Sequence, residues 1–200
     1  MVNTAQADSG ETRTRARTRR TILQAAVEVL GTDRSAPLSE VARAAGVSRS
    51  TLQRYFPERV DLVRALDQHV WELVDEATER ARPTEGTAIE ALERLVAELF
   101  ELRAPVMLVA SDADPEGECD DGEGEDQGEQ DSSSDLAMYD LVERGHEDGT
   151  VDPRITPLWF KHLLWATLYT GWGYGASARV SSYEALRLTV HSFLKAVERR

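Results

Sequence analysis

The sequence is poor in cysteine and in long hydrophobic runs. Its single cysteine, Cys119, excludes an internal disulfide. No apolar run approaches the roughly 20 residues that cross a membrane, and the first ten residues lack the apolar stretch of a signal peptide. We therefore expect a cytoplasmic protein without membrane contact.

The motifs of enzymes and metal sites are also missing. The sequence has no phosphate-binding glycine loop and no nucleophile elbow, and its four histidines are too scattered for a metal motif. We therefore expect no enzyme, no cofactor and no bound metal.

Acidic residues crowd into one tract, 111–135, which holds twelve Asp and Glu and no Lys or Arg. Such a composition predicts a disordered insertion. Residues 112–123 match part of a calcium-loop pattern, but Pro115 interrupts the match and an acidic tract meets such patterns by chance. We favour a flexible insertion over a calcium site.

The formal net charge of −13 is unevenly distributed. Residues 1–70 carry eleven Arg against four Asp and four Glu, a net charge of +3, so the acidic excess belongs to the remainder. An arginine-rich head predicts nucleic-acid binding there. We expect residues 1–14 to be a disordered arm, and the arginines of residues 13–20 either stay solvated or follow the DNA minor groove and phosphates.

Residues 38–59, LSEVARAAGVSRSTLQRYFPER, predict a helix, a tight turn and a second helix. Ser39 is placed to cap the first helix, and Gly46 to end it in a left-handed conformation. Ser48 is placed to cap the second helix, which Pro57 ends.

The second short helix has two different faces. One face carries Leu52, Tyr55 and Phe56; the other carries the polar residues Ser50, Gln53 and Arg54, flanked by Arg49 and Thr51. An ordinary amphipathic surface helix shows the same pattern. Two such short helices bury little by themselves, however, which favours a helix-turn-helix whose second helix enters the DNA major groove.

This stretch resembles the tetracycline-repressor-like (TetR) family of transcriptional regulators. The family signature runs I-A-x-x-A-G-V-S-x-x-T-L-Y-x-Y-F, and ten positions agree in register: Val41, Ala42, Ala45, Gly46, Val47, Ser48, Thr51, Leu52, Tyr55 and Phe56.

Two positions depart from the family pattern. Gln53 replaces an aromatic residue that packs on the DNA backbone, so it contacts phosphate or reads an adenine edge. Arg59 replaces a lysine that meets a phosphate. Pattern and resemblance together give the expected DNA-binding set: Ser39, Ser48, Arg49, Ser50, Thr51, Gln53, Arg54, Tyr55 and Arg59.

Helical periodicity continues through the chain and predicts an all-α fold. A three-helix helix-turn-helix head over 15–62 is joined by a long helix to a helical body over 63–200, with the acidic insertion at 111–135. The resemblance implies that this body binds an effector and forms the dimer.

Two sets of body residues are candidates for these roles. The last two helices predict a four-helix interface between two copies, with Leu163, Leu186, Val190, Phe193 and Val197. An apolar effector cavity would be lined by Phe100, Met107, Met138, Tyr139, Trp165, Tyr169 and Trp172, although such residues at helical spacing are also typical of plain core.

The sequence therefore favours a homodimeric repressor of a palindromic DNA operator, released by a small, largely apolar effector. Two alternatives stay open. One is a regulator without an effector, whose body is filled; the other is a protein-interaction adaptor that acts through the acidic tract.

Overall fold

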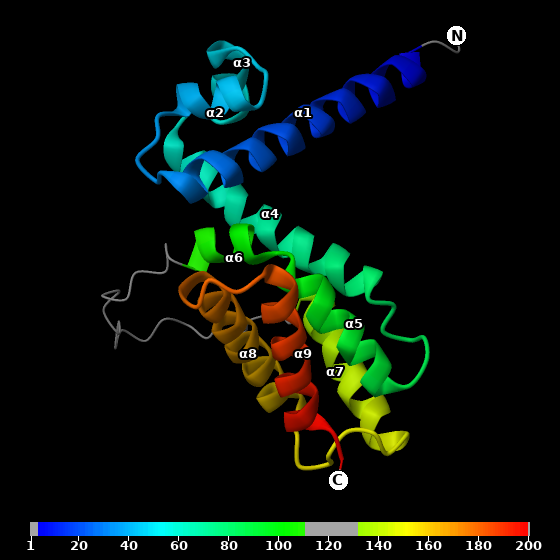
Figure 1. Cartoon of the computed structure of the whole chain (residues 1–200). Coiled ribbons are helices and arrows are strands. Elements are labelled where there is room, and N and C mark those ends of the chain that lie inside the picture. Colours follow the sequence, from blue (N-terminus) through cyan, green and yellow to red (C-terminus); the bar gives the residue numbers. More distant parts are fainter. Residues whose placement is uncertain (1–3, 111–131, 200) are drawn as a thin grey trace, which may run out of the picture. The chain divides into compact units, whose positions relative to one another are not determined.

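The computed structural model describes residues 4–110 and 132–199, and these residues form nine α-helices with no β-sheet beyond one bridge between Val151 and Glu198 (Figure 1). The predicted all-helical fold is confirmed. The helices are α1 (Thr4–Thr32), α2 (Leu38–Ala44), α3 (Arg49–Tyr55), α4 (Arg59–Arg80), α5 (Ala88–Phe100), α6 (Arg103–Ala110), α7 (Ser133–Glu147), α8 (Pro157–Ser177) and α9 (Ser182–Val197).

The described residues divide into two compact units. The head unit comprises residues 4–71 and 104–110, and the body unit comprises 72–103 and 132–199. The head therefore extends beyond the boundary expected at residue 62 and includes most of α6. The reason is packing: Leu108 is buried in the same apolar cluster as α1 to α3, and the Arg34 guanidinium donates to the Leu108 carbonyl.

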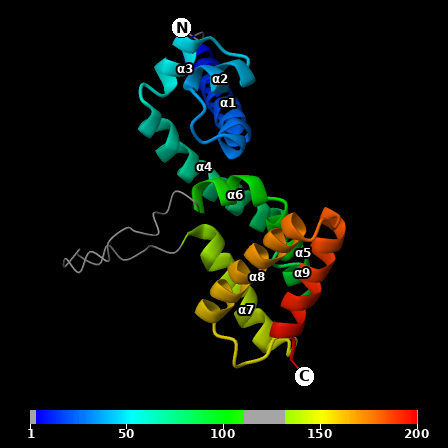
Figure 2. The same cartoon turned by 60° about the vertical axis from the view of Figure 1, so that its left-hand side comes forward.

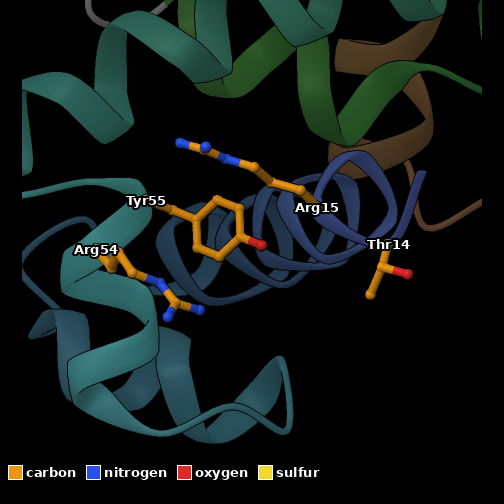
Figure 3. A pocket seen from close by; sticks show the side chains of 4 residues that line it. All are labelled: Thr14, Arg15, Arg54 and Tyr55. Atoms are coloured by element: carbon orange, nitrogen blue, oxygen red, sulfur yellow. The ribbon is translucent and has the colours of Figure 1, made fainter. Parts of the chain in front are cut away.

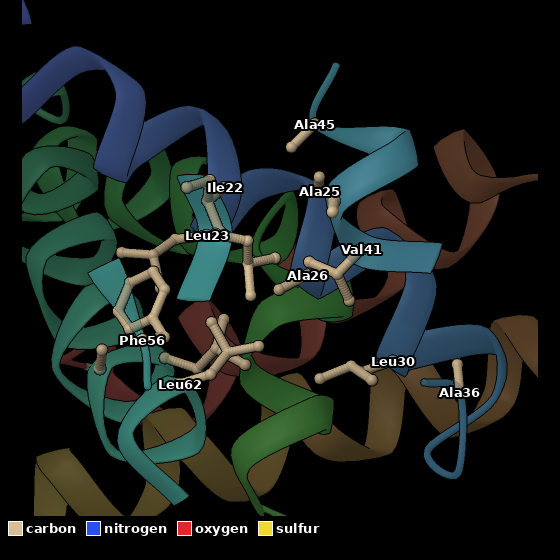
Figure 4. Packing of buried hydrophobic residues seen from close by; sticks show 14 of the residues in the cluster. Ile22, Leu23, Ala25, Ala26, Leu30, Ala36, Val41, Ala45, Phe56 and Leu62 are labelled. Atoms are coloured by element: carbon tan, nitrogen blue, oxygen red, sulfur yellow. The ribbon is translucent and has the colours of Figure 1, made fainter. Parts of the chain in front are cut away.

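The core of the head unit is built from small and branched apolar residues. Figure 4 shows α1, α2, α3 and the start of α4 contributing side chains to it, among them Ile22, Leu23, Ala26, Val41, Phe56 and Leu62. Burying a Leu, Ile or Phe side chain fully is worth about 1.5–3 kcal/mol. This cluster therefore holds two helices of seven residues each, which would not be stable alone.

The N-terminal segment corrects an expectation. Residues 1–14 were expected to be a disordered arm, but α1 begins at Thr4 and runs without interruption to Thr32. Residues 4–20 contain no proline, and alanine, glutamine, glutamate and arginine are good helix formers. The arginines of residues 13–20 consequently lie on a helix, which gives each of them a definite direction.

The body unit begins its helices with side-chain caps. Thr87 and Glu90 form a capping box at the start of α5, and Ser132 and Asp135 form another at the start of α7. Asp135 also makes an ion pair with Lys161, with 2.8 Å between carboxylate oxygen and Nζ. Residues 132–135, which the sequence assigned to the insertion, thus form the cap and the first turn of α7. The partial calcium pattern and Cys119 lie outside the described residues.

Helices α8 and α9 pack against each other and against α5, and α8 also packs against α7 (Figure 2). They approach each other closely at Gly171, where an added Cβ would lie 2.0 Å from the Thr189 hydroxyl oxygen. The Phe160 and Phe193 rings meet edge to face, with centroids 5.5 Å apart. In the described parts of the chain, no helix combines the length and the apolarity needed to span a membrane.

Candidate nucleic-acid interface

The turn between α2 and α3 depends on Gly46. Its φ of +66° lies in the left-handed region, as predicted, and the amide that follows it, Val47 N–H, donates to the Ala42 carbonyl at 3.0 Å. The predicted cap at Ser39 is wrong. Pro37 occupies the N-cap position with extended backbone angles, so Ser39 lies within the first turn and is exposed.

Hydroxyl groups gather at the start of α3. Ser48 is the N-cap, as predicted: its Oγ accepts a hydrogen bond from the Thr51 amide at 3.1 Å. The same oxygen lies 3.0 Å from Ser50 Oγ and 2.8 Å from Thr51 Oγ1. The N-terminus of α3 is therefore fixed in the head and presents several hydrogen-bonding groups to solvent.

The two faces of α3 lie as the periodicity predicts. Leu52 is buried and Tyr55 is half-buried, while the polar residues Arg49, Ser50, Gln53 and Arg54 are exposed. The helix ends at Tyr55, one residue earlier than expected, and the buried Phe56 is its C-cap. Burial of one side therefore turns the polar side outward as a continuous face.

Arg59, the first residue of α4, makes hydrogen bonds within the head unit. It is half-buried, and its guanidinium donates to the carbonyl oxygens of Ala36, at 2.8 Å, and of Arg34. In the same loop, the Ser35 hydroxyl and amide donate to Asp33; these bonds and the nearby Arg59 lower the pKa of the Asp33 carboxyl. Arg59 thus holds the connection between α1 and α2, and its contact with a DNA phosphate stays a prediction.

Three arginines lie over the aromatic residues at the end of α3. The guanidinium carbons of Arg15 and Arg54 are each 5.9 Å from the Tyr55 ring centroid, and that of Arg19 is 5.9 Å from the Phe56 centroid. A groove of about 470 Å³ is lined by Thr14, Arg15, Arg54 and Tyr55 (Figure 3). Sequence reasoning treated Arg15 and Arg19 as members of an arm; their four-residue spacing places them on one helix face.

Six of the seven effector candidates belong to the body unit, and four of these form a chain of rings. The ring centroids are 6.3 Å apart for Phe100 and Trp172, 5.4 Å for Tyr169 and Trp172, and 6.4 Å for Trp165 and Tyr169. On α7, Met138 is buried and Tyr139 is half-buried. The seventh candidate, Met107, is exposed and belongs to the head unit.

The expected dimer residues divide into two groups. Leu163, Leu186 and Val190 are half-buried in the single chain. Phe193 and Val197 have no exposed surface, so they belong to the interior of the body unit and are corrected as interface residues. Helical spacing did identify an apolar stripe on α9, but part of that stripe faces α5 and α8.

Large apolar side chains are exposed elsewhere on α8 and α9. Leu158 and Trp159 on α8 are 61% and 58% exposed, and Tyr183 and Leu188 on α9 are 70% and 48% exposed. Among residues 4–110 and 132–199, no group of three or more His, Cys, Asp or Glu is arranged to hold a metal ion.

Comparison with known proteins decides the family. Residues 22–66 match the family model of bacterial regulatory proteins, tetR family. The HTH-type transcriptional repressor LfrR of Mycolicibacterium smegmatis is 38% identical over 166 residues, which cover 81% of this chain and 81% of LfrR. The chain belongs to the TetR family. It is a DNA-binding helix-turn-helix transcriptional regulator and not an enzyme.

Two solved structures of LfrR from Mycobacterium smegmatis share the TetR fold with this chain. The complex of LfrR with proflavine is 35% identical, has a TM-score of 0.68, and the match covers 90% of this chain and 96% of LfrR. A second LfrR structure is 31% identical with a TM-score of 0.57, covering 86% and 95% of the two chains.

The Ser48 cap leads to a prediction about stability. We expect Ser48→Ala to lower the free energy of unfolding by about 1 kcal/mol, because the Thr51 amide loses its acceptor at the helix start. Ser39→Ala is the matched control: Ser39 is also an exposed serine at the start of a short helix but makes no cap, so its change should stay within about 0.5 kcal/mol. Urea unfolding measures both; equal losses would contradict the prediction.

Proposed function

We propose that this TetR-family protein is a homodimeric repressor that acts in the cytoplasm on a palindromic operator and is released by a small aromatic effector. The observation that carries the DNA-reading part is the exposed polar face of α3. In a helix-turn-helix, the N-terminal residues of the second helix contact base edges in the major groove. Arg49 and Ser50 occupy these positions and Gln53 lies one turn further along the same exposed face, so we assign base contacts to all three.

The pairing of two copies is supported by the exposed apolar residues of α8 and α9. Large apolar groups in contact with water favour association, because burying them removes apolar surface from solvent. We assign Leu158, Trp159, Tyr183 and Leu188 to the interface, with the half-buried Leu163, Leu186 and Val190 beside them. A two-fold dimer then presents two α3 helices to two half-sites related by the same symmetry.

The class of effector is suggested by the rings of the body unit together with the relative LfrR, whose structure was solved with proflavine. Trp165 is half-buried and Tyr169 is partly exposed, so both rings have surface left to meet a ligand. Burial raises the pKa of Tyr169, and its phenol stays a neutral hydrogen-bond donor at pH 7. Flat aromatic molecules stack well on such side chains, and we propose a flat aromatic compound as effector.

The test begins with selection of bound fragments from genomic DNA by the purified protein. Titration of the recovered duplex should show two protomers per site and an affinity that falls with salt. Proflavine, added next, should release the DNA, because a ligand shifts the equilibrium only if it binds the released form more tightly.

Proflavine is itself flat and can bind DNA directly, so a protein control is needed. We expect Trp165→Ala to keep its operator affinity but to require about tenfold more proflavine for release. If proflavine released the variant and the natural protein equally, the release would come from proflavine bound to the DNA and not from a site in the protein. Operator selection without any release would favour the regulator without an effector, and absence of selection would contradict the repressor.

A further inference from the structure

Arg15 is exposed on α1 and has no part in the function proposed so far. Because α1 is helical through this region, the Arg15 side chain reaches the C-terminal end of α3. Figure 3 shows the Arg15 and Arg54 side chains on opposite sides of the Tyr55 ring. Each guanidinium carbon lies 5.9 Å from the ring centroid, within the range of a cation–π contact.

The geometry concentrates positive charge at one place. Both guanidinium carbons lie 5.9 Å from the same ring centroid, so the distance between them is at most twice that value. Arg15 and Arg54 line the groove of about 470 Å³ together with Tyr55. Both guanidinium groups carry a positive charge at neutral pH, so both attract an anion that binds there. Guanidinium groups also bind phosphate oxygens in pairs of hydrogen bonds.

The position on α3 indicates which anion. Arg54 lies near the C-terminal end of α3, whereas base edges are contacted from the N-terminal part of a recognition helix. The DNA backbone runs beside that helix on the walls of the groove, and along one strand its charges recur about every 3.4 Å of helix axis. Arg15 and Arg54 are therefore placed to contact neighbouring phosphates of one strand.

We propose that Arg15, Arg54 and Tyr55 form a phosphate clamp that grips one DNA strand beside each half-site. The proposal rests on the proposed function, in which α3 enters the major groove, and adds a contact from α1 to it. Arg19 has a different part: it is half-buried over the buried Phe56, so it positions α1 against α3. The phosphate clamp increases affinity for DNA of any sequence, because phosphates carry no sequence information.

The test compares Arg15→Ala with Arg17→Ala. Arg17 is an exposed arginine on the same helix, and its position two residues away turns its side chain roughly 200° around the axis. Binding is measured by fluorescence anisotropy on the selected operator and on a random duplex, each at four salt concentrations.

For Arg15→Ala we expect about tenfold weaker binding to both duplexes and a slope of log K against log salt that is smaller by about 1. Arg17→Ala should bind within about twofold of the natural protein. Arg15→Lys should recover only part of the loss, because lysine keeps the charge but cannot bind a phosphate through a pair of guanidinium hydrogen bonds. Unchanged melting temperatures would exclude a folding defect, as expected for an exposed side chain.

Two results would overturn the phosphate clamp: Arg15→Ala and Arg17→Ala behaving alike, or a loss confined to the operator, which would mean sequence reading. The random duplex separates this proposal from the proposed function. If no operator is selected but Arg15→Ala still binds random DNA more weakly than the natural protein, the proposed function is refuted and the phosphate clamp is supported. If an operator is selected but Arg15→Ala binds DNA as tightly as the natural protein, the phosphate clamp is refuted and the proposed function stands.

Discussion

Phe56→Ala is expected to unfold the head unit and abolish operator binding. Phe56 is the C-cap of α3, is almost fully buried, and belongs to the one apolar cluster that holds α1, α2 and α3 together. Truncating a buried phenylalanine costs about 3–5 kcal/mol. A complete domain is stable by only about 5–15 kcal/mol, and a unit as small as the head lies towards the low end.

Circular dichroism during urea unfolding and anisotropy on the operator measure this effect. Two controls make the comparison specific. Phe56→Leu keeps most of the apolar volume and should cost less than about 1.5 kcal/mol, with DNA binding retained. Val60→Ala removes an exposed apolar group from the start of α4 and should change stability by less than about 0.5 kcal/mol. Native DNA affinity in Phe56→Ala would show that this cluster does not hold α3.

Trp172→Ala is expected to destabilise the body unit by a similar amount. The Trp172 side chain is only 1% exposed, its ring lies against Phe100 and Tyr169, and its Nε1 donates to the Phe100 carbonyl at 2.8 Å. The substitution leaves a cavity, at about 3–5 kcal/mol, and removes the donor from a carbonyl at the end of α5. For a chain of this size the melting temperature should fall by about 10 °C or more.

Trp172→Phe separates the two contributions. It retains one ring in the cavity and loses the indole N–H with the volume of the second ring, so we expect a smaller loss than in Trp172→Ala, of about 1–2 kcal/mol. Differential scanning calorimetry at one fixed protein concentration compares the two variants, since association also affects the transition. A loss below about 1 kcal/mol in Trp172→Ala would contradict the close packing of this residue.

Local features of the fold could be predicted from the sequence because their causes are local. The Ser48 cap, the left-handed Gly46 and the buried side of α3 each depend on residues within four positions of one another. The helix start after Thr156 is of the same kind, since Thr156 caps it and Pro157 follows at once. The helix-turn-helix motif is made only of such features, which explains why it was recognisable and why the family followed from it.

Other features depended on what packs against each helix. Periodicity showed an apolar stripe on α9, but only the tertiary structure placed Phe193 against Phe160 in the interior. The Ser39 cap failed for a smaller reason, since Pro37 is the N-cap and α2 begins at Leu38, two residues earlier than expected.

The sequence by itself determined the family, the all-helical class and the residues that α3 exposes. The tertiary structure decided that Leu108 belongs to the head core, that Arg59 binds loop carbonyls, and that Arg15 lies over Tyr55. The physical reason is the range of the interactions. Hydrogen bonds and caps within a helix join residues a few positions apart, whereas these three contacts join segments that are more than twenty residues apart and meet only when the helices pack.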